Sequence, residues 1–162
     1  MRFLCDQMLG TLAKWLRFAG YDACYASQRM TDDEVLKKTQ KESRVLLTSD
    51  KELVLRAKKR LISVVHIRSI KIEDQMCQTL LETKTNLHSD MMFTRCAECN
   101  DIVQKVDKGD IEQKVPEMVF EKHEMFLYCP TCKRIYWMGT HTEQISKKLA
   151  QIKKRCENYD LL

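Results

Sequence analysis

The chain has 162 residues and a formal net charge of +5, and eight of its residues are cysteine. This length suits one ordinary domain, or one small domain with a second module attached. A hydrophobic content of 44% and a charged content of 31% are typical of a soluble globular protein. The sequence has no apolar run long enough to cross a membrane and no hydrophobic signal segment at its N-terminus. We therefore expect a cytoplasmic protein without a membrane partner.

Residues 1–82 alternate between strand-like and helix-like segments. The apolar pattern predicts strands over 2–6, 21–26, 44–50 and 61–67, and helices over 8–19, 32–42, 51–60 and 72–82. Gly20 stands where glycine commonly ends a helix. Capping boxes from Thr31 to Glu34 and from Ser49 to Glu52 predict two helix starts. The alternating order predicts an α/β fold over 1–90, with a parallel sheet and helices on both faces.

Four of the eight cysteines are scattered among apolar residues: Cys5, Cys24, Cys77 and Cys156. Free cysteine behaves as a small hydrophobic residue and is usually buried. A reducing compartment also disfavours disulfides. We therefore expect these four residues to be core thiols without chemistry.

The other four cysteines form two C-x-x-C pairs, Cys96 with Cys99 and Cys129 with Cys132. This spacing lets two tight turns aim four thiolates at one tetrahedral zinc ion. A redox C-x-x-C would instead be a single pair at the start of a helix. The two pairs predict one structural zinc site, which leaves no open position for catalysis.

The segment that carries these pairs, 91–141, is expected to be a zinc ribbon with short β hairpins over 93–138. It follows a polar, non-periodic linker over 83–92. A basic amphipathic helix is expected over 142–162. Its apolar stripe consists of Ile145, Leu149, Ile152 and Cys156.

Acidic residues stand at three strand–helix junctions. Asp6 ends the first predicted strand, Asp32 and Asp33 follow the second, and Asp50 ends the third. The carboxyl ends of parallel strands meet at one edge of an open sheet, where ligands bind. Carboxylates held close together stay ionised when a cation lies between them, and Mg²⁺ and Mn²⁺ prefer oxygen ligands. Asp6, Asp33 and Asp50 are therefore candidate Mg²⁺ or Mn²⁺ ligands, with Glu34 and Glu52 as candidate outer ligands.

The competing interpretation is that these aspartates only cap helices. Aspartate is a favoured N-cap residue, and each of these residues lies where a helix is expected to begin. Thr31 and Ser49 are available to cap two of those helices, which would leave the aspartates for a ligand. From the residues alone, both interpretations stay open.

The surplus of positive charge lies before residue 91 and after residue 132, on either side of an acidic segment. Basic surfaces favour polyanions through counterion release. The candidate nucleic-acid-binding residues are Lys58, Lys59, Arg60, Lys147, Lys148, Lys154 and Arg155. Runs of charge are also common on surfaces that only meet solvent, and an aromatic content of 7% offers no obvious stacking platform.

Three residues shortly before the last predicted helix each have two possible roles. Tyr136 and Trp137 are candidate stacking residues, but burial in the ribbon is the favoured interpretation. His141 could contact phosphate, but capping the last helix or packing on the ribbon is favoured.

The sequence resembles a known family over nearly its whole length. The resemblance is carried by FLCDQMLGTLAKWLRFAGYDACYA (3–26), TDDEVL (31–36), RVLLTSDKEL (44–53), RCAECN (95–100) and VPEMVFEKHEMFLYCPTCKRIYWMGTH (115–141). In this order, these segments resemble the PIN-like ribonuclease of the Mut-seven C-terminal RNase domain family, with its C-terminal zinc ribbon. The resemblance implies metal-dependent cleavage of RNA. It places Asp6, Asp33 and Asp50 at the family's acidic positions, with Asp32 and Glu52 as further candidates.

The residues and the resemblance together predict a metal-dependent endoribonuclease that acts on RNA such as tRNA or rRNA. We expect one structural Zn²⁺ and a catalytic Mg²⁺ or Mn²⁺ that supports in-line attack of water on a phosphodiester. One alternative is a non-catalytic RNA- or ribosome-binding protein with a degenerate PIN-like domain. A phosphotransfer receiver is a third interpretation. It needs a lysine after a late strand, and Lys71 follows only the fourth strand.

Overall fold

The computed structural model of the chain describes residues 1–159, without the side chain of Tyr159. Its first region alternates strands and helices, as the sequence predicts. The elements are β1 (Arg2–Cys5), the 3₁₀ turn η1 (Gln7–Leu9), α1 (Gly10–Phe18), β2 (Asp22–Tyr25), α2 (Asp32–Lys41), β3 (Val45–Thr48), α3 (Lys51–Lys59), β4 (Val64–His66) and α4 (Ile72–Thr83). Each predicted strand and helix of this region is present, with small shifts at its ends.

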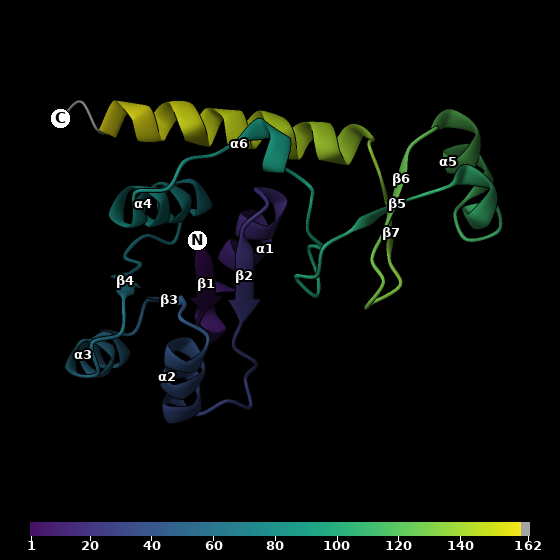
Figure 1. The fold of residues 1–162 in the computed structure, drawn as a ribbon. Helices are drawn as coiled ribbons and strands as arrows, with labels where there is room; N and C mark the ends of the chain where they lie inside the picture. Colours follow the sequence, from purple (N-terminus) through teal and green to yellow (C-terminus); the bar gives the residue numbers. More distant parts are fainter. Residues whose placement is uncertain (160–162) are drawn as a thin grey trace.

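The four strands form one parallel sheet in the order β2-β1-β3-β4. Helices α1 and α4 cover one face of this sheet, and α2 and α3 cover the other (Figure 1). The predicted α/β class and the two-sided cover are therefore confirmed. Because all four strands run in the same direction, their carboxyl ends share one edge.

The sheet separates two apolar clusters. Phe3 and Leu4 are consecutive in β1 and point to opposite faces, as strand geometry requires. Phe3 packs with residues of α1 and α4, and Leu4 packs with residues of α2 and α3. Both side chains have no exposed surface. Burial of such a side chain stabilises the fold by about 1.5–3 kcal/mol.

Two predicted helix boundaries are confirmed. Thr31 caps α2 in a complete capping box, in which the Glu34 side chain accepts the Thr31 N–H at 2.8 Å. Gly20 follows α1 with a φ of +89°, a conformation that L residues rarely adopt. A Cβ atom at this position would lie 2.1 Å from the carbonyl oxygen of Met91. Glycine therefore ends the helix and also lets the chain near Met91 pack against it.

The second region is a three-stranded antiparallel sheet in the order β5-β6-β7. Its strands are β5 (Gln104–Val106), β6 (Phe126–Tyr128) and β7 (Ile135–Trp137), and the 3₁₀ turn η2 (Ser89–Met91) precedes them. The expected β hairpins are thus present. The 3₁₀ turn η3 (Lys108–Ile111) and the short helix α5 (Glu117–Lys122) lie between β5 and β6 and were not predicted. Pro116 immediately precedes α5, a position where the missing N–H of proline is tolerated.

The last helix, α6 (Thr140–Tyr159), returns from the ribbon and lies along α4 (Figure 1). It begins at Thr140, slightly before the expected start at 142, and residues 160–162 of the predicted helix lie outside the described residues. The predicted apolar stripe is confirmed, since Ile145, Leu149, Ile152 and Cys156 are all buried in the cluster formed with α1 and α4. Among residues 1–159, no helix is both long and apolar enough to cross a membrane.

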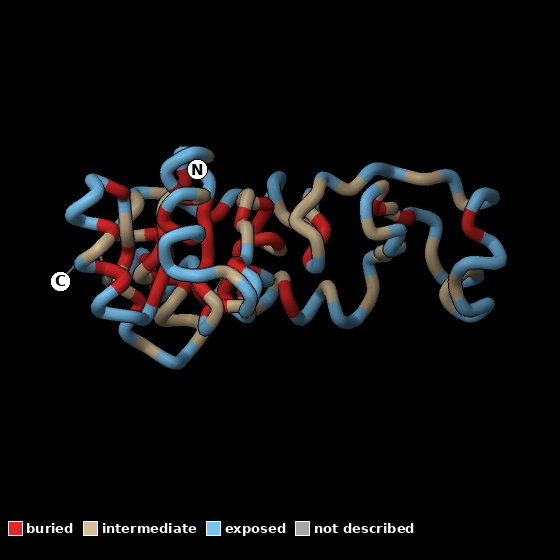
Figure 2. The backbone as a smooth tube through the Cα atoms, turned by 90° about the horizontal axis from the view of Figure 1, so that it is seen from below, coloured by how far each residue is buried: buried red, intermediate tan, exposed pale blue. Residues whose placement is uncertain are grey.

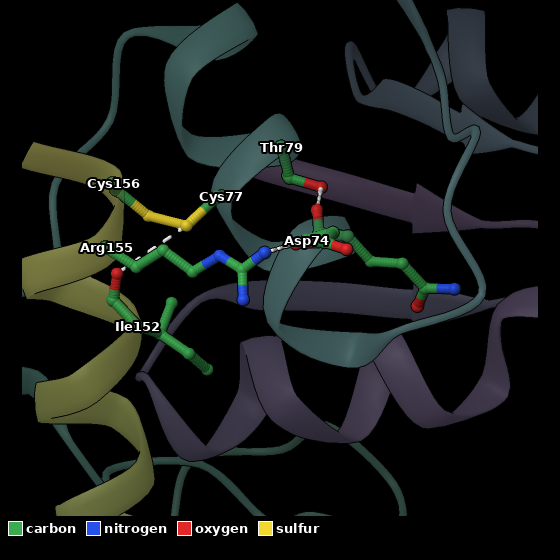
Figure 3. Close-up of a disulfide and its surroundings, with 7 residues drawn as sticks. Asp74, Cys77, Thr79, Ile152, Arg155 and Cys156 are labelled. Atoms are coloured by element: carbon green, nitrogen blue, oxygen red, sulfur yellow. Dashed lines mark hydrogen bonds and ion pairs between the residues drawn. A yellow bond between two sulfur atoms is a disulfide. The ribbon is translucent and has the colours of Figure 1, made fainter. Parts of the chain in front are cut away.

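Cys77 and Cys156 correct the expectation that all four scattered cysteines are isolated core thiols. They form a disulfide between α4 and α6, with their Cα atoms 5.2 Å apart (Figure 3). The sequence pattern places each cysteine on the buried side of its helix, but only the packing of α6 on α4 brings the two together. Cys5 and Cys24 remain free thiols, and burial raises the pKa of Cys5.

Candidate functional site

Asp6 lies at the carboxyl end of β1 and is 8% exposed. Its Oδ1 accepts the backbone N–H of Gln7 at 2.7 Å, which caps η1. Its Oδ2 accepts the hydroxyl of Thr48 at 2.8 Å, and its own N–H donates to the carbonyl of Leu47 at 2.9 Å. Asp6 is therefore held against the end of the neighbouring strand, β3.

Asp50 lies just beyond the carboxyl end of β3 and caps α3. Its Oδ1 accepts the backbone N–H groups of Glu52 at 2.7 Å and Leu53 at 3.1 Å. The predicted capping box from Ser49 to Glu52 is therefore wrong: the helix begins at Lys51, as predicted, but its N-cap is Asp50 and not Ser49. Glu52, one of the two expected outer ligands, is exposed in the first turn of α3, and the other, Glu34, is held in the capping box with Thr31.

Thr48 joins these two aspartates. Its buried hydroxyl donates to Asp6 Oδ2 and accepts the backbone N–H of Asp50 at 3.0 Å. Two of the predicted acids thus meet at one edge of the sheet through a shared hydroxyl. Thr48 was not singled out from the sequence. Its position could have been noticed in the sequence, because Thr48 is the one hydroxyl residue of the strand Val45–Thr48 and stands at its carboxyl end.

Asp32 and Asp33 lie in the first turn of α2 and pair with arginines of α3. Arg56 lies 2.7 Å from Asp32 Oδ2 and 2.9 Å from Asp33 Oδ1, and Arg60 donates to the same Asp33 oxygen at 2.5 Å. The hydrogen bond from Arg60, with the charge of Arg56, lowers the pKa of Asp33. Within residues 1–159, no three acidic side chains place their oxygens within 4.8 Å of one another.

The basic residues predicted on α3 are exposed at its C-terminal end: Lys58, Lys59 and Arg60. Arg56 was not predicted, although it stands four residues before Arg60, a spacing that places both on one face of the helix. Through these two arginines, α3 presents positive charge directly to the acids of α2.

The basic residues predicted on α6 divide into two kinds. Lys147 and Lys154 are exposed. Lys148 pairs with Glu73 of α4 at 2.6 Å and lies 5.4 Å above the ring of Trp15. Arg155 pairs with Asp74 of α4 beside the disulfide (Figure 3). Lys148 and Arg155 thus help to hold α6 on the α/β region.

The four C-x-x-C cysteines form a second candidate site. Their Sγ atoms all lie within 4.8 Å of one another. The distance from Cys96 to Cys132 is 3.4 Å and that from Cys99 to Cys129 is 3.3 Å. These distances exceed the S–S bond length of about 2.05 Å. They are close to the roughly 3.8 Å between sulfurs in a tetrahedral site with 2.3 Å bonds. The donor set fits a closed structural zinc site.

Tyr136 supports this cluster from β7. Its hydroxyl lies 3.0 Å from Cys96 Sγ. Burial works to raise the pKa of Cys96, but hydrogen bonds from Tyr136 and from the backbone N–H groups of Cys99 and Glu98 lower it to about 6. These hydrogen bonds favour the thiolate of Cys96, the form that ligates zinc.

Hydrogen bonds attach the first cysteine turn, which carries Cys96 and Cys99, to the α/β region. Arg17 of α1 is only 6% exposed. Its Nη1 donates to the carbonyls of Ala97 at 2.9 Å and Glu98 at 2.8 Å, and its Nε donates to the carbonyl of Ala23 in β2 at 2.8 Å. Asn100 Oδ1 accepts the backbone N–H of Ala23 at 2.9 Å. The ribbon is therefore anchored to both α1 and β2.

The fold and these sites define a protein in which an α/β region with an aspartate-bearing edge is followed by a four-cysteine ribbon. The model of one protein family, the Mut7-C RNase domain, matches residues 1–149. The chain belongs to this family, which confirms the resemblance noted from the sequence and implies ribonuclease activity. No curated protein and no solved structure matches the chain. The match covers the α/β region, the ribbon and the first half of α6.

Proposed function

We propose that this protein is a metal-dependent endoribonuclease that cleaves phosphodiester bonds of RNA. Family membership implies a ribonuclease and an RNA substrate. For this chain, the proposal rests on one observation, the two carboxylates at the ends of the adjacent strands β1 and β3, joined by the Thr48 hydroxyl. Ligands of open parallel sheets bind at this edge.

The donor set at this edge fits Mg²⁺ or Mn²⁺. Sites for these ions commonly use one or two carboxylates and keep positions for water and phosphate oxygens. Asp6 and Asp50 would provide the two carboxylates, Asp33 would join them on substrate binding, and Asp32 and Glu52 lie in the neighbouring first turns. When bound, the cation would neutralise phosphate charge and lower the pKa of water.

Arg56 and Arg60 would bind the RNA phosphates. A guanidinium forms paired hydrogen bonds with phosphate as readily as with carboxylate. An arriving phosphate can therefore replace Asp32 and Asp33 as the partner of these arginines. The exchange would free the Asp33 carboxylate at the moment the substrate arrives.

The ribbon would hold one structural Zn²⁺ at its four cysteines and would assist RNA binding. The exposed residues Lys58, Lys59, Lys147 and Lys154 would attract the RNA backbone, and this contribution would weaken as salt increases.

Mn²⁺-dependent cleavage of labelled single-stranded RNA and of folded tRNA tests the proposal. The variants Asp6→Asn and Asp50→Asn keep the side-chain shape and remove the charge. We expect each to lower kcat at least 100-fold, because loss of even an outer partner of a metal costs about 10- to 100-fold. Asp90→Asn, at an exposed acid of η2, is the matched control. Cleavage at the wild-type rate by both edge variants would remove the assignment of the site.

A second candidate function is RNA or ribosome binding without cleavage. The observation that favours it is that Asp6, Asp32, Asp33 and Asp50 each already have a hydrogen bond or ion pair with the protein. Calorimetric titration of the zinc-loaded chain with Mn²⁺ separates the two functions. RNA binding together with no Mn²⁺ affinity would support the binding protein.

A further inference from the structure

A cavity lies where the ribbon meets α1 and the first turn of α6. Its volume is about 210 Å³. Aromatic rings from three segments line it: Phe18 of α1, Phe93 of the connecting chain, and Tyr136 and Trp137 of β7. All four residues are only half-buried, so part of each side chain stays accessible even though Phe18 and Phe93 also pack against the core. The stacking interpretation of Tyr136 and Trp137 therefore gains support over full burial.

The cavity is too large and too open to be a packing defect. Protein interiors are close-packed and contain few voids larger than one water molecule. The volume here is many times the roughly 10–15 Å³ that one water requires. Two methionines of its wall, Met125 and Met138, are 49% and 45% exposed. Flexible thioethers next to aromatic rings can adapt to an entering flat ring.

The polar part of the wall is positively charged on balance. Lys14 and Glu98 pair across 2.7 Å, and Arg95 donates one hydrogen bond from Nη1 to the carbonyl of Asn100 at 2.9 Å. The other N–H groups of Arg95, and His141, complete the polar part of the wall. His141 was expected to cap α6 or to pack on the ribbon, but it is exposed. Thr142 forms the hydrogen bonds with Gly139 at the start of α6 instead. Arg95 and His141 both line the cavity and can donate hydrogen bonds to an anion.

We propose that this cavity binds an unpaired base of RNA, with the adjoining phosphate at Arg95 and His141. Proteins recognise single-stranded RNA by stacking splayed bases on aromatic side chains while basic residues hold the backbone. The charge of Arg95 favours a nucleotide over an apolar peptide, which would offer this guanidinium no anion. The inference rests on the proposed function in that it takes RNA as the ligand, and it adds a site for one nucleotide outside the aspartate edge.

Fluorescence of Trp137 tests the proposal directly. The chain has two tryptophans, and Trp15→Phe leaves Trp137 as the one fluorescent indole. The probe is a 2′-O-methyl oligouridylate, which stays single-stranded and resists cleavage, added to zinc-loaded protein. We expect this RNA to quench Trp137 and a duplex RNA to leave it unchanged. Quenching by an apolar peptide but not by the RNA would overturn the proposal.

Binding of the same labelled RNA, followed by anisotropy, measures the contribution of stacking. Trp137→Leu keeps an apolar side chain but removes the stacking surface, and we expect affinity to fall on the order of 10-fold. His141→Gln should cause a smaller loss and a shallower dependence on salt. Ile70→Ala, at a fully exposed apolar residue outside the cavity, should bind as the wild type does.

Zinc content is measured for each variant as a check that the ribbon is intact. If Trp137→Leu disturbs the ribbon, His141→Gln and the quenching experiment test the base-binding proposal. Unchanged affinity in Trp137→Leu and His141→Gln would overturn the inference, and cleavage by the wild type would still support the proposed function. Conversely, Trp137-dependent binding by a chain that cleaves no RNA would support the inference and exclude the nuclease.

Discussion

The α/β region and the zinc ribbon differ in what stabilises them. In the α/β region, two clusters of fully buried side chains flank the sheet. In residues 91–139, the buried residues are Cys96, Ala97, Ile111, Phe126 and Cys129. Figure 2 accordingly shows buried backbone concentrated in one half of the molecule and a mostly exposed tube in the other. So few buried side chains offset little of the conformational entropy lost on folding, and we expect a zinc ion at the four cysteines to supply the rest of the stability.

We therefore expect one chain to combine a region that folds through burial with a region that folds through metal ligation. The two are not independent, because Arg17 and Asn100 join the first cysteine turn to α1 and β2. Loss of order in the ribbon should therefore lower the stability of the α/β region.

Removal of zinc should have the largest effect. A structural zinc contributes about 10–16 kcal/mol to the folding of such a site. We expect a chelator, or Cys99→Ser, to abolish the ordered NMR signals of 96–137 while the far-UV signal of the α/β helices remains. Cys24→Ser, at a half-buried thiol that is not a ligand, is the control. An ordered ribbon in the zinc-free chain would contradict the expectation that the ribbon, unlike the α/β region, needs zinc to fold.

Reduction of the disulfide should come next. Cys77 and Cys156 are 79 residues apart, and closing a loop of this length stabilises a fold by about 4–5 kcal/mol in the chain-entropy model. Urea unfolding of the oxidised and reduced protein in excess zinc measures the difference. The reductant should have no effect on Cys156→Ser. Equal midpoints for the oxidised and reduced wild type would show that the bond does not constrain α6.

Arg17→Met should cost about 3 kcal/mol, because it leaves the carbonyls of Ala23, Ala97 and Glu98 without a charged donor. It should also reduce the stabilisation that zinc gives to the α/β region, as measured by thermal unfolding with and without the metal. Lys14→Met is the control, because its half-exposed pair with Glu98 is worth only about 0–1 kcal/mol. Full zinc dependence in Arg17→Met would mean that the two regions are coupled elsewhere.

The smallest effect concerns Asp22, which lies in β2 beside the ribbon. Burial works to raise the pKa of Asp22, but hydrogen bonds from Arg44 and Asn100 outweigh it and lower the pKa from 3.8 to about 2. The resulting stability, about 2 kcal/mol, is present above pH 4 and is lost as the pH falls towards 2. Asp22→Asn should flatten the dependence of unfolding free energy on pH in this window. An unchanged slope would show that the pair with Arg44 does not stabilise the strand.

The parts of the fold that could be predicted rest on local signals. Thr31 and Gly20 set the ends of helices through contacts within one turn, and strand and helix periods differ clearly along the first region. The capping error at Ser49 has a local origin too, because serine and aspartate are adjacent and both are good caps. Helix α5 was missed because it is only six residues long.

By itself, the sequence determined the order of the elements in the α/β region, the four cysteines of the ribbon, and the strand ends that carry Asp6 and Asp50. These properties follow from periodicity and from spacing along the chain. Only the tertiary structure decided that Cys77 meets Cys156, that Arg56 and Arg60 hold Asp32 and Asp33, and that aromatic rings from three segments surround one cavity. The physical reason is that these partners are far apart in sequence, so their meeting depends on how helices pack and on where the ribbon docks.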